Sequence, residues 1–264
     1  HQTVLFSATM PPEILRIAKR YQNDPEHVKI AQKQLTVEGI EQVYYEVPTA
    51  RKIDALCSLI DLHASVRAMV FCNTKRQVDD LVGLLMMRGY RADGLHGDMK
   101  QSQRSRVMSL FKSGRTRLLV ATDVAARGID VDDIETVFNF DIPQDHEFYV
   151  HRIGRTGRAG KTGLAITLVC SKREIYELRN IERYTKSRIR RRALPPADAI
   201  EKARCASFVS AVRTSLSENK PSHYEDTLAQ ILADTAYTER DVALILLDQI
   251  LGVQTASTSE RDHM

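Results

Sequence analysis

The sequence contains no tryptophan, and its aromatic residues amount to only 6% of the chain. It also lacks any run of about eighteen apolar residues, so it does not predict a membrane-spanning helix. Its first residues do not have the basic and then apolar arrangement of a secretory signal peptide. We therefore expect a cytoplasmic protein.

Cysteine is scarce as well. Cys57, Cys72, Cys170 and Cys205 are far apart and form no C-x-x-C pair, and the eight histidines are similarly dispersed. The spacings typical of zinc sites and of disulfide frameworks are therefore missing. We expect reduced cysteines in a protein core and no metal centre.

The positive charge is concentrated in the first part of the chain. Residues 193–264 carry a net charge of −5, which leaves +9 for residues 1–192 of a chain whose total is +4. The hydrophobic content of 43% is ordinary for a globular protein and argues against disorder throughout. A basic domain with few aromatic side chains favours a phosphate-bearing partner that is contacted through its backbone.

Short apolar segments alternate with amphipathic ones over the middle of the chain. The pattern predicts strands at 42–47, 67–72, 91–96, 116–121, 136–140 and 163–169, and helices at 51–63, 75–88, 101–112, 146–153 and 171–184. Before them, residues 1–6 read as a strand, 13–21 as a helix and 24–41 as a linker. Alternation of this kind predicts an α/β fold with an open, mostly parallel sheet that helices cover on both faces.

Beyond the proline pair at 195 and 196, the composition changes to helix formers, with predicted helices at 199–215, 224–234 and 239–251. The last helix is apolar nearly all round, and such a small helical unit has little interior of its own. We expect self-association through a set of apolar side chains: Leu228, Ile231, Val242, Ile245, Ile250 and Leu251. The alternative is that this helix packs back on the sheet domain of its own chain.

Polar groups follow three of the predicted strands. Asn73 and Thr74 follow the second strand, residues 96–98 follow the third, and Thr122 and Asp123 follow the fourth. Ligands of open parallel sheets gather at the carboxyl ends of the strands, so these groups are candidates for one site. The alternative for each is an ordinary turn or helix cap.

Residues 151–160 read His-Arg-Ile-Gly-Arg-Thr-Gly-Arg-Ala-Gly, in which three arginines alternate with glycines at the end of a predicted helix. Guanidinium groups can clamp a terminal phosphate, and glycine removes the Cβ atoms that would hold a ligand away. The alternative is a basic loop on a solvated surface.

Together these segments resemble the DEAD-box family of ATP-dependent RNA helicases over residues 1–192. Ser7, Ala8 and Thr9 are similar to motif III, residues 69–74 to motif IV, Gln101 with Arg104 to the Q-x-x-R element, residues 121–130 to motif V, and residues 151–160 to motif VI. The resemblance implies the end of a first helicase domain at 1–23, a linker at 24–41, and a RecA-like parallel sheet sandwiched by helices at 42–192. The small all-α domain at 195–256 is similar in position to the dimerisation region of bacterial cold-shock and degradosome-linked DEAD-box helicases.

The resemblance also implies roles for single residues. Arg155 and Arg158 would be arginine fingers on the γ-phosphate of ATP, Gly128 and Asp130 would lie at the nucleotide, and His151, Ser7 and Thr9 would couple the two domains. RNA would be held along its sugar-phosphate backbone by Thr74, Gly97, Gln101, Arg104, Thr122 and Asp123. These groups suit phosphate oxygens and read no base.

The family's phosphate-binding loop, Asp-Glu-Ala-Asp box and adenine-reading glutamine do not occur in this sequence, and the Gly-Lys-Thr at 160–162 lacks the glycine a phosphate loop requires five positions earlier. We therefore expect the chain alone not to hydrolyse ATP, with Mg²⁺ held by a first domain. The alternative is a non-enzymatic module that binds RNA and dimerises; a related DNA-translocating ATPase is disfavoured by motifs V and VI. Residues 186–192, rich in lysine and arginine, are a further candidate for RNA contact, and the acidic tail is not.

Overall fold

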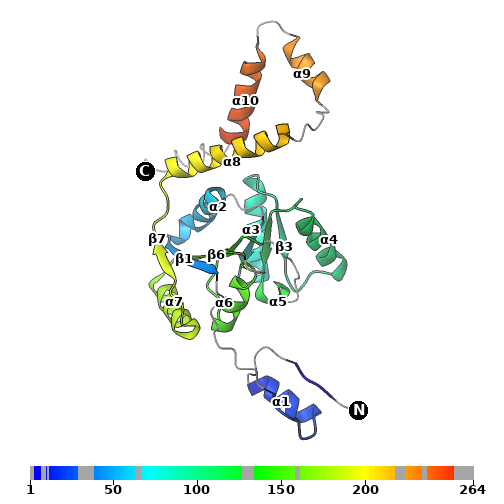
Figure 1. Cartoon of the computed structure of the whole chain (residues 1–264), viewed down its shortest axis with the longest axis vertical. Coiled ribbons are helices and arrows are strands. Elements are labelled where there is room, and N and C mark those ends of the chain that lie inside the picture. Colours follow the sequence, from blue (N-terminus) through cyan, green and yellow to red (C-terminus); the bar gives the residue numbers. More distant parts are fainter. Residues whose placement is uncertain are drawn as a thin grey trace. The chain divides into compact units, whose positions relative to one another are not determined.

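The computed structural model (Figure 1) describes residues 3–6, 10, 12–28, 39–63, 67–126, 134–157, 161–217, 224–233 and 237–252. The chain forms two compact units, His1–Leu35 and Thr36–Met264. We describe each unit by itself.

The first unit contains one helix, α1 (Pro12–Tyr21), among its described residues, and this confirms the predicted helix. The predicted strand over 1–6 is wrong for the described residues 3–6, which form no regular element. A strand needs a hydrogen-bonded neighbour, and the described part of this unit provides none. Val4 and Phe6 are consequently 61% and 91% exposed.

The second unit is built on a parallel sheet whose seven strands lie in the order β3-β4-β2-β5-β6-β1-β7. The strands are β1 (Ile40–Glu46), β2 (Ala68–Phe71), β3 (Ala92–Leu95), β4 (Leu118–Ala121), β5 (Thr136–Asn139), β6 (Gly163–Val169) and β7 (Arg190–Arg192). Every adjacent pair is parallel. This confirms the α/β class and all six strands predicted for the sheet.

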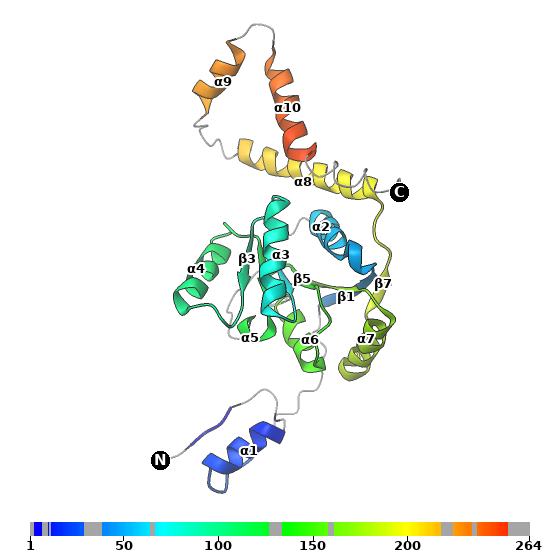
Figure 2. The same ribbon diagram turned by 180° about the vertical axis from the view of Figure 1, so that it is seen from behind.

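Helices cover both faces of the sheet (Figures 1 and 2). They are α2 (Lys52–His63), preceded by the 3₁₀ turn η1 (Thr49–Arg51), then α3 (Lys75–Met87), α4 (Gln101–Lys112), α5 (Asp123–Ala126), α6 (His146–Ile153) and α7 (Lys172–Thr185). Alternate residues of a strand point to opposite faces. Accordingly Val70 packs in a cluster with α2 and α3, whereas Met69 packs with α4 and α5. A third cluster on the face of Tyr44 joins α6 and α7 to β1 and β6.

The central strands are apolar at every position because both of their faces are buried. All four residues of β2 and all four of β4 are buried. Such strands appear in a sequence as continuous apolar runs without alternation. The polar residues that follow them therefore mark the point where each strand leaves the core.

Two elements were not predicted. Arg190–Arg192 form the edge strand β7, paired with β1, although all three side chains are exposed. An edge strand with no buried face has no apolar pattern, so only main-chain pairing identifies it. The second is α5, a single turn whose alanines Ala125 and Ala126 are buried.

Three helices follow the sheet, as predicted: α8 (Ala197–Ser217), α9 (Glu225–Leu232) and α10 (Glu239–Gly252). Helix α8 contacts α2. In α10, Val242 is buried, but Ile245 and Ile250 are 57% and 56% exposed. Across the described ranges, no helix combines the length and apolar character needed to cross a membrane. A separate helical domain at 195–256 stays a prediction.

Gly163, at the start of β6, allows close contact with the loop after α6. A Cβ built there would lie 2.6 Å from the backbone N of Gly157 and from Oγ1 of Thr156. We expect Gly163→Ala to lower the free energy of unfolding by about 1–3 kcal/mol, because backbone must shift to relieve the overlap. Denaturant unfolding measures this.

Gly83→Ala is the matched control. Gly83 lies inside α3, and a Cβ there meets nothing within 4 Å. Alanine should raise the free energy of unfolding by about 0.5–1 kcal/mol, since glycine loses more backbone entropy in a helix. Equal effects of the two substitutions would contradict the assigned packing.

Candidate functional site

Three loops meet at one edge of the sheet because their strands are neighbours. Strands β3, β4 and β2 lie side by side, so Gly97, Thr122 and Thr74 follow adjacent carboxyl ends. The backbone N of Thr122 donates to the carbonyl of Leu95 at 3.2 Å, which continues the sheet into the loop. The predicted convergence of these groups is thus confirmed, and their roles stay predictions.

The local geometry of these loops leaves backbone accessible. Thr74 caps α3, its Oγ1 accepting from the backbone N of Gln77 at 3.2 Å. Gly97 is exposed, and a Cβ built on it would meet nothing within 4 Å. The helix-cap reading of Thr74 is therefore correct, and a cap residue at a helix N-terminus also suits an anion.

Helix α4 is tied to the loop after β4. Gln101 begins α4 and is exposed. Arg104, one turn later, donates from Nη2 to the carbonyl of Ala125 in α5 at 3.1 Å. The two residues of the predicted Q-x-x-R element thus lie on the helix that packs beside β3 and α5.

Arg152 of α6 is the most deeply buried charged side chain among the described residues, with 1% of its surface exposed. Its Nε and Nη2 donate to the two carboxylate oxygens of Asp123 at 2.6 and 2.8 Å. Nη1 donates to the carbonyl of Asp141 at 2.6 Å and Nη2 to Oδ1 of Asn73 at 2.9 Å. The guanidinium therefore joins α6 to the ends of β2, β4 and β5.

Asp141 extends this network. Its Oδ1 accepts from Lys52 Nζ at 2.9 Å and from Gln77 Nε2 at 3.1 Å, and its Oδ2 accepts from the backbone N of Asn73 at 3.0 Å. The Lys52 and Asp141 side chains are only 11% and 13% exposed. Asn73, which precedes the cap residue Thr74, is thus held by both its backbone and its side chain.

One ion pair and one cysteine bear on the charge of this edge. The Lys75 ammonium is hydrogen-bonded to Asp98, which raises the pKa of Lys75 and lowers that of Asp98, so both are charged at neutral pH. The second case is Cys72, directly before Asn73: burial is the largest cause that raises the pKa of its thiol. Cys72 is therefore an inert core thiol.

Helix α6 ends at Ile153, and the arginine-glycine stretch follows. Its cap residue Gly154 donates to the carbonyl of Val150 at 2.9 Å, and Arg155 donates from its backbone N to the carbonyl of Arg152 at 3.1 Å. Thr156 is buried, and its Oγ1 donates to the carbonyl of Glu135 at 2.8 Å. The start of this loop is thus anchored to the sheet.

The glycines of this loop contribute to packing within the chain. Gly157 has φ +68, and a Cβ there would lie 2.6 Å from Cγ1 of Ile40. A Cβ on Gly154 would lie 3.1 Å from the carbonyl of Val150. At Gly157 the side chain of Ile40 occupies the space that a Cβ would need, so packing within the chain requires glycine there. That the glycines also leave room for a ligand stays a prediction.

Comparison with known proteins identifies this arrangement. The family model for the helicase conserved C-terminal domain matches residues 51–160. The DEAD-box ATP-dependent RNA helicase CshA of Bacillus subtilis (strain 168) is 48% identical over 234 residues, 89% of this chain and 47% of that helicase. The solved C-terminal domain of the DEAD-box protein Dbp5 matches with a TM-score of 0.58 and 34% identity, over 65% of this chain and 99% of that domain.

The chain belongs to the DEAD-box family of RNA helicases. Its sheet is the RecA-like fold of the C-terminal helicase domain. S. cerevisiae Dbp5 bound to RNA and ADP BeF3 also matches, with a TM-score of 0.65 and 32% identity, over 76% of this chain and 54% of that one. The chain spans about half the length of the curated DEAD-box relatives that it matches.

Several residues that the DEAD-box motifs single out lie outside the described residues: Ser7, Thr9, Gly128, Asp130 and Arg158. Of the others, His151 is exposed on α6 and Arg155 is partly buried in the loop after it. Asp123 is positioned by its ion pair with Arg152, and its side chain is 16% exposed. Its predicted contact with RNA is compatible with that ion pair, because a carboxylate accepts more than two hydrogen bonds.

Sequence reasoning missed the structural importance of Arg152, Asp141 and Lys52 in this DEAD-box domain. Arginine is almost never fully buried unless it is paired, so a sequence pattern does not predict it as core. One signal was present: Arg152 lies between His151 and the apolar Ile153 on a short amphipathic helix. Its partners Asp123 and Asn73 are 29 and 79 residues away in the sequence, so a local sequence pattern could not predict them.

We expect Arg152→Ala to lower the free energy of unfolding by about 3–5 kcal/mol, because it leaves the partly buried Asp123 carboxylate without its partner. Denaturant unfolding of the whole chain measures this. Arg173→Ala is the control: this arginine is 88% exposed and forms an ion pair with Glu177 on the same helix, so its loss should change stability by less than about 0.5 kcal/mol.

The double variant Arg152→Ala with Asp123→Ala tests the cause. It should be less destabilised than the sum of the two single variants by about 0.5–3 kcal/mol. Strict additivity would mean that the ion pair is not the source of the loss.

Proposed function

We propose that this chain is the C-terminal half of an ATP-dependent RNA helicase that locally unwinds or remodels RNA duplexes. The observation that carries the proposal is the convergence of Thr74, Gly97 and Thr122 on adjacent strand ends, joined through the buried Arg152 to the helix that leads to Arg155. RNA lies along those strand ends through its sugar-phosphate backbone. Hydroxyls, backbone N–H groups and Arg104 suit phosphate oxygens and give no base specificity.

The arginines after α6 act on the second substrate, ATP. Arg155 and Arg158 stabilise the charge on the γ-phosphate when a first domain, which holds the nucleotide with Mg²⁺, closes against this one. Gly128 and Asp130 lie at the nucleotide, and His151, Ser7 and Thr9 couple the domains. Because closure brings the arginines to the phosphate, turnover depends on bound RNA.

The connection from the strand ends to Arg155 supports this coupling. Arg152 is hydrogen-bonded to Asn73 and Asp123, which flank the RNA groups Thr74 and Thr122, and its backbone carbonyl accepts from the N of Arg155. A displacement of the RNA-side loops therefore moves the helix that carries the arginines. This is a short, packed path between two ligands.

Replacement of both Arg155 and Arg158 by alanine, in a helicase that joins this chain to its first domain, should lower RNA-stimulated ATP turnover by about 10³–10⁵. RNA affinity should be nearly unchanged, since neither residue contacts RNA in this proposal. Arg173→Ala with Lys202→Ala is the control for the loss of two positive charges. The 264-residue chain by itself should give no RNA-stimulated turnover.

The non-enzymatic alternative predicts the reverse pattern. If the domain only binds RNA, the double variant would lose RNA affinity and keep its turnover per bound RNA. Appreciable RNA-stimulated hydrolysis by the chain alone would contradict the assignment of the nucleotide site to two domains.

We also propose that α9 and α10 mediate homodimerisation. Leu228, Ile231, Ile245 and Ile250 are each 42% exposed or more. Exposed apolar side chains grouped on two helices are typical of an interaction surface. Val242 and Leu251 belong to the same predicted set, although Val242 is already buried within the chain. Dimers would place two helicase domains on one RNA in the cytoplasm.

Light scattering over a wide concentration range tests this. The whole chain should have twice its monomer mass, and Ile245→Glu with Ile250→Glu should reduce it to the monomer, because two charges cannot be buried unpaired in an interface. Met87→Glu is the control, since Met87 is 77% exposed on α3. A chain that is monomeric at every concentration would contradict dimerisation.

A further inference from the structure

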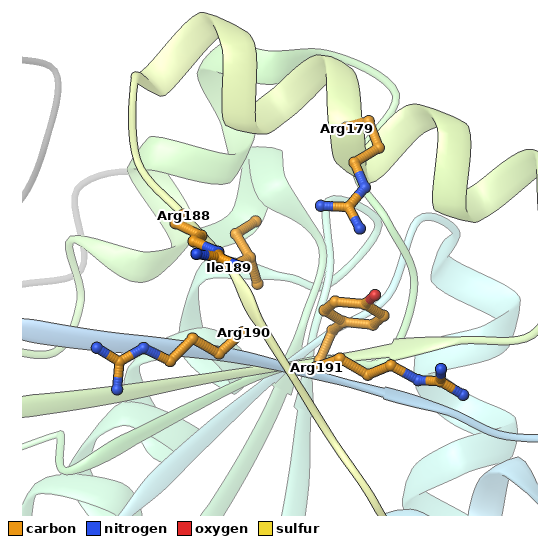
Figure 3. A pocket seen from close by; sticks show the side chains of 6 residues that line it. Arg179, Arg188, Ile189, Arg190 and Arg191 are labelled. Carbon is orange, nitrogen blue, oxygen red and sulfur yellow. The ribbon is translucent and has the colours of Figure 1, made fainter.

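A surface pocket of about 450 Å³ lies at the β7 edge of the sheet, at the basic segment 186–192 and apart from the core site residues (Figure 3). Its lining consists of Tyr44, Arg179, Arg188, Ile189, Arg190 and Arg191. We call it the β7 arginine pocket. Four of its six residues are arginines, contributed by α7, by the segment before β7 and by β7 itself.

Half of this charge is already neutralised. Arg179 Nη1 lies 2.6 Å from Glu182 Oε2, and Arg191 Nη2 lies 3.1 Å from Glu46 Oε2. Arg188 and Arg190 are exposed, and within the described ranges no ion pair is found for either. Two positive charges therefore remain available for a ligand.

The chemistry of the pocket favours a phosphate ligand. A guanidinium group presents a planar fork of donors that matches phosphate oxygens. The two apolar lining residues, Tyr44 and Ile189, are 4% and 2% exposed, so they do not offer a ring on which a base could stack. The ligand is therefore recognised by its backbone and not by its bases.

The directions of the arginines favour a continuous strand over a compact anion. Arg190 and Arg191 are consecutive residues of β7 and leave the strand in opposite directions, and Arg179 extends from α7 (Figure 3). Diverging guanidinium groups suit successive phosphates of a chain. A small polyphosphate would need them to converge on one point.

The strand order gives the distance across the sheet between the β7 arginine pocket and the candidate RNA groups at the ends of β2, β4 and β3. β7 is four strands from β2 and six from β3, which at about 4.8 Å per strand is roughly 19 and 29 Å. With about 3.4 Å between successive phosphates of a stacked strand, this distance corresponds to roughly six to nine nucleotides. An RNA that only fills the core groups would not reach the pocket.

We propose that the β7 arginine pocket binds the phosphodiester backbone of RNA that flanks the segment held at Thr74, Gly97 and Thr122. The proposal rests on the proposed function, because it assumes RNA at the strand ends. It adds a second, sequence-independent contact that retains a long RNA while the core releases and rebinds it.

The test compares a short RNA that fills only the core groups with one about ten nucleotides longer, both titrated with the whole 264-residue chain by fluorescence anisotropy. Arg188→Ala with Arg190→Ala should weaken binding of the long RNA and leave the short RNA unchanged. For the long RNA, the slope of the logarithm of the association constant against the logarithm of the salt concentration should fall in magnitude by about 1.4. This corresponds to two lost contacts with single-stranded RNA.

The control variant Arg173→Ala with Lys202→Ala removes the same charge at sites 88% and 81% exposed, each paired with an acid on its own helix. It should not alter the slope. If it weakens the long RNA equally, the effect is one of net charge and the pocket proposal is overturned. Thermal unfolding checks that both variants fold.

Arg104→Ala separates the two proposals, because it should weaken both RNAs. If Arg104→Ala acts and the pocket variant does not, the pocket proposal fails and the proposed function stands. If Arg104→Ala has no effect on either RNA, the proposed function itself fails. Binding of inorganic polyphosphate to the pocket without competition from the long RNA would assign the site to a free anion and overturn the RNA proposal.

Discussion

The guanidinium of Arg152 is the group on which the candidate site depends. It is a charge almost fully withdrawn from water, and such a charge is tolerated only where its donors are satisfied. The guanidinium donates four hydrogen bonds: two to the carboxylate of Asp123, one to the carbonyl of Asp141 and one to Oδ1 of Asn73. Because those acceptors follow three different strands, satisfying one side chain sets the positions of three loops and of α6. Loss of any of these hydrogen bonds leaves part of the buried guanidinium without an acceptor, so the three loops and α6 hold their positions cooperatively.

The parallel sheet determines what lies beside what. Strands β3, β4 and β2 place the candidate RNA groups on one side, and β7 brings its arginines to the opposite edge with β5, β6 and β1 in between. The α6 helix packs in the cluster of Tyr44 on the other half of the sheet, and Arg152 joins it by a hydrogen bond to Asn73 on the RNA side. The fold therefore keeps two candidate anion-binding edges apart, and the buried Arg152 side chain joins three loops of the core site.

Small residues in the loop after α6 serve packing within the chain. Gly157 adopts a positive φ beside Ile40, and Gly163 lies against the backbone of that same loop. Thr156 is buried and hydrogen-bonded to the carbonyl of Glu135. These contacts restrict the loop from which Arg155 projects. A restricted loop loses less conformational entropy when its charged group binds a ligand than a flexible loop does. Alternation of glycine with arginine thus reflects anchoring of the loop at least as much as access for a ligand.

The sequence by itself determined the α/β class, the strands of the sheet interior, the helices and the polar residues at the strand ends. These features depend on local periodicity and on apolar runs, which are visible in the sequence without knowledge of tertiary contacts. The DEAD-box motifs likewise indicated the family before any contact was known. Only the tertiary structure decided that Arg190–Arg192 pair as a strand with β1. It also decided that Ile40 occupies the space a Cβ on Gly157 would need, and that Arg152 is buried against Asp123 and Asn73. Each of these rests on a partner distant in sequence, because main-chain pairing, steric exclusion and burial of a charge are properties of two surfaces in contact.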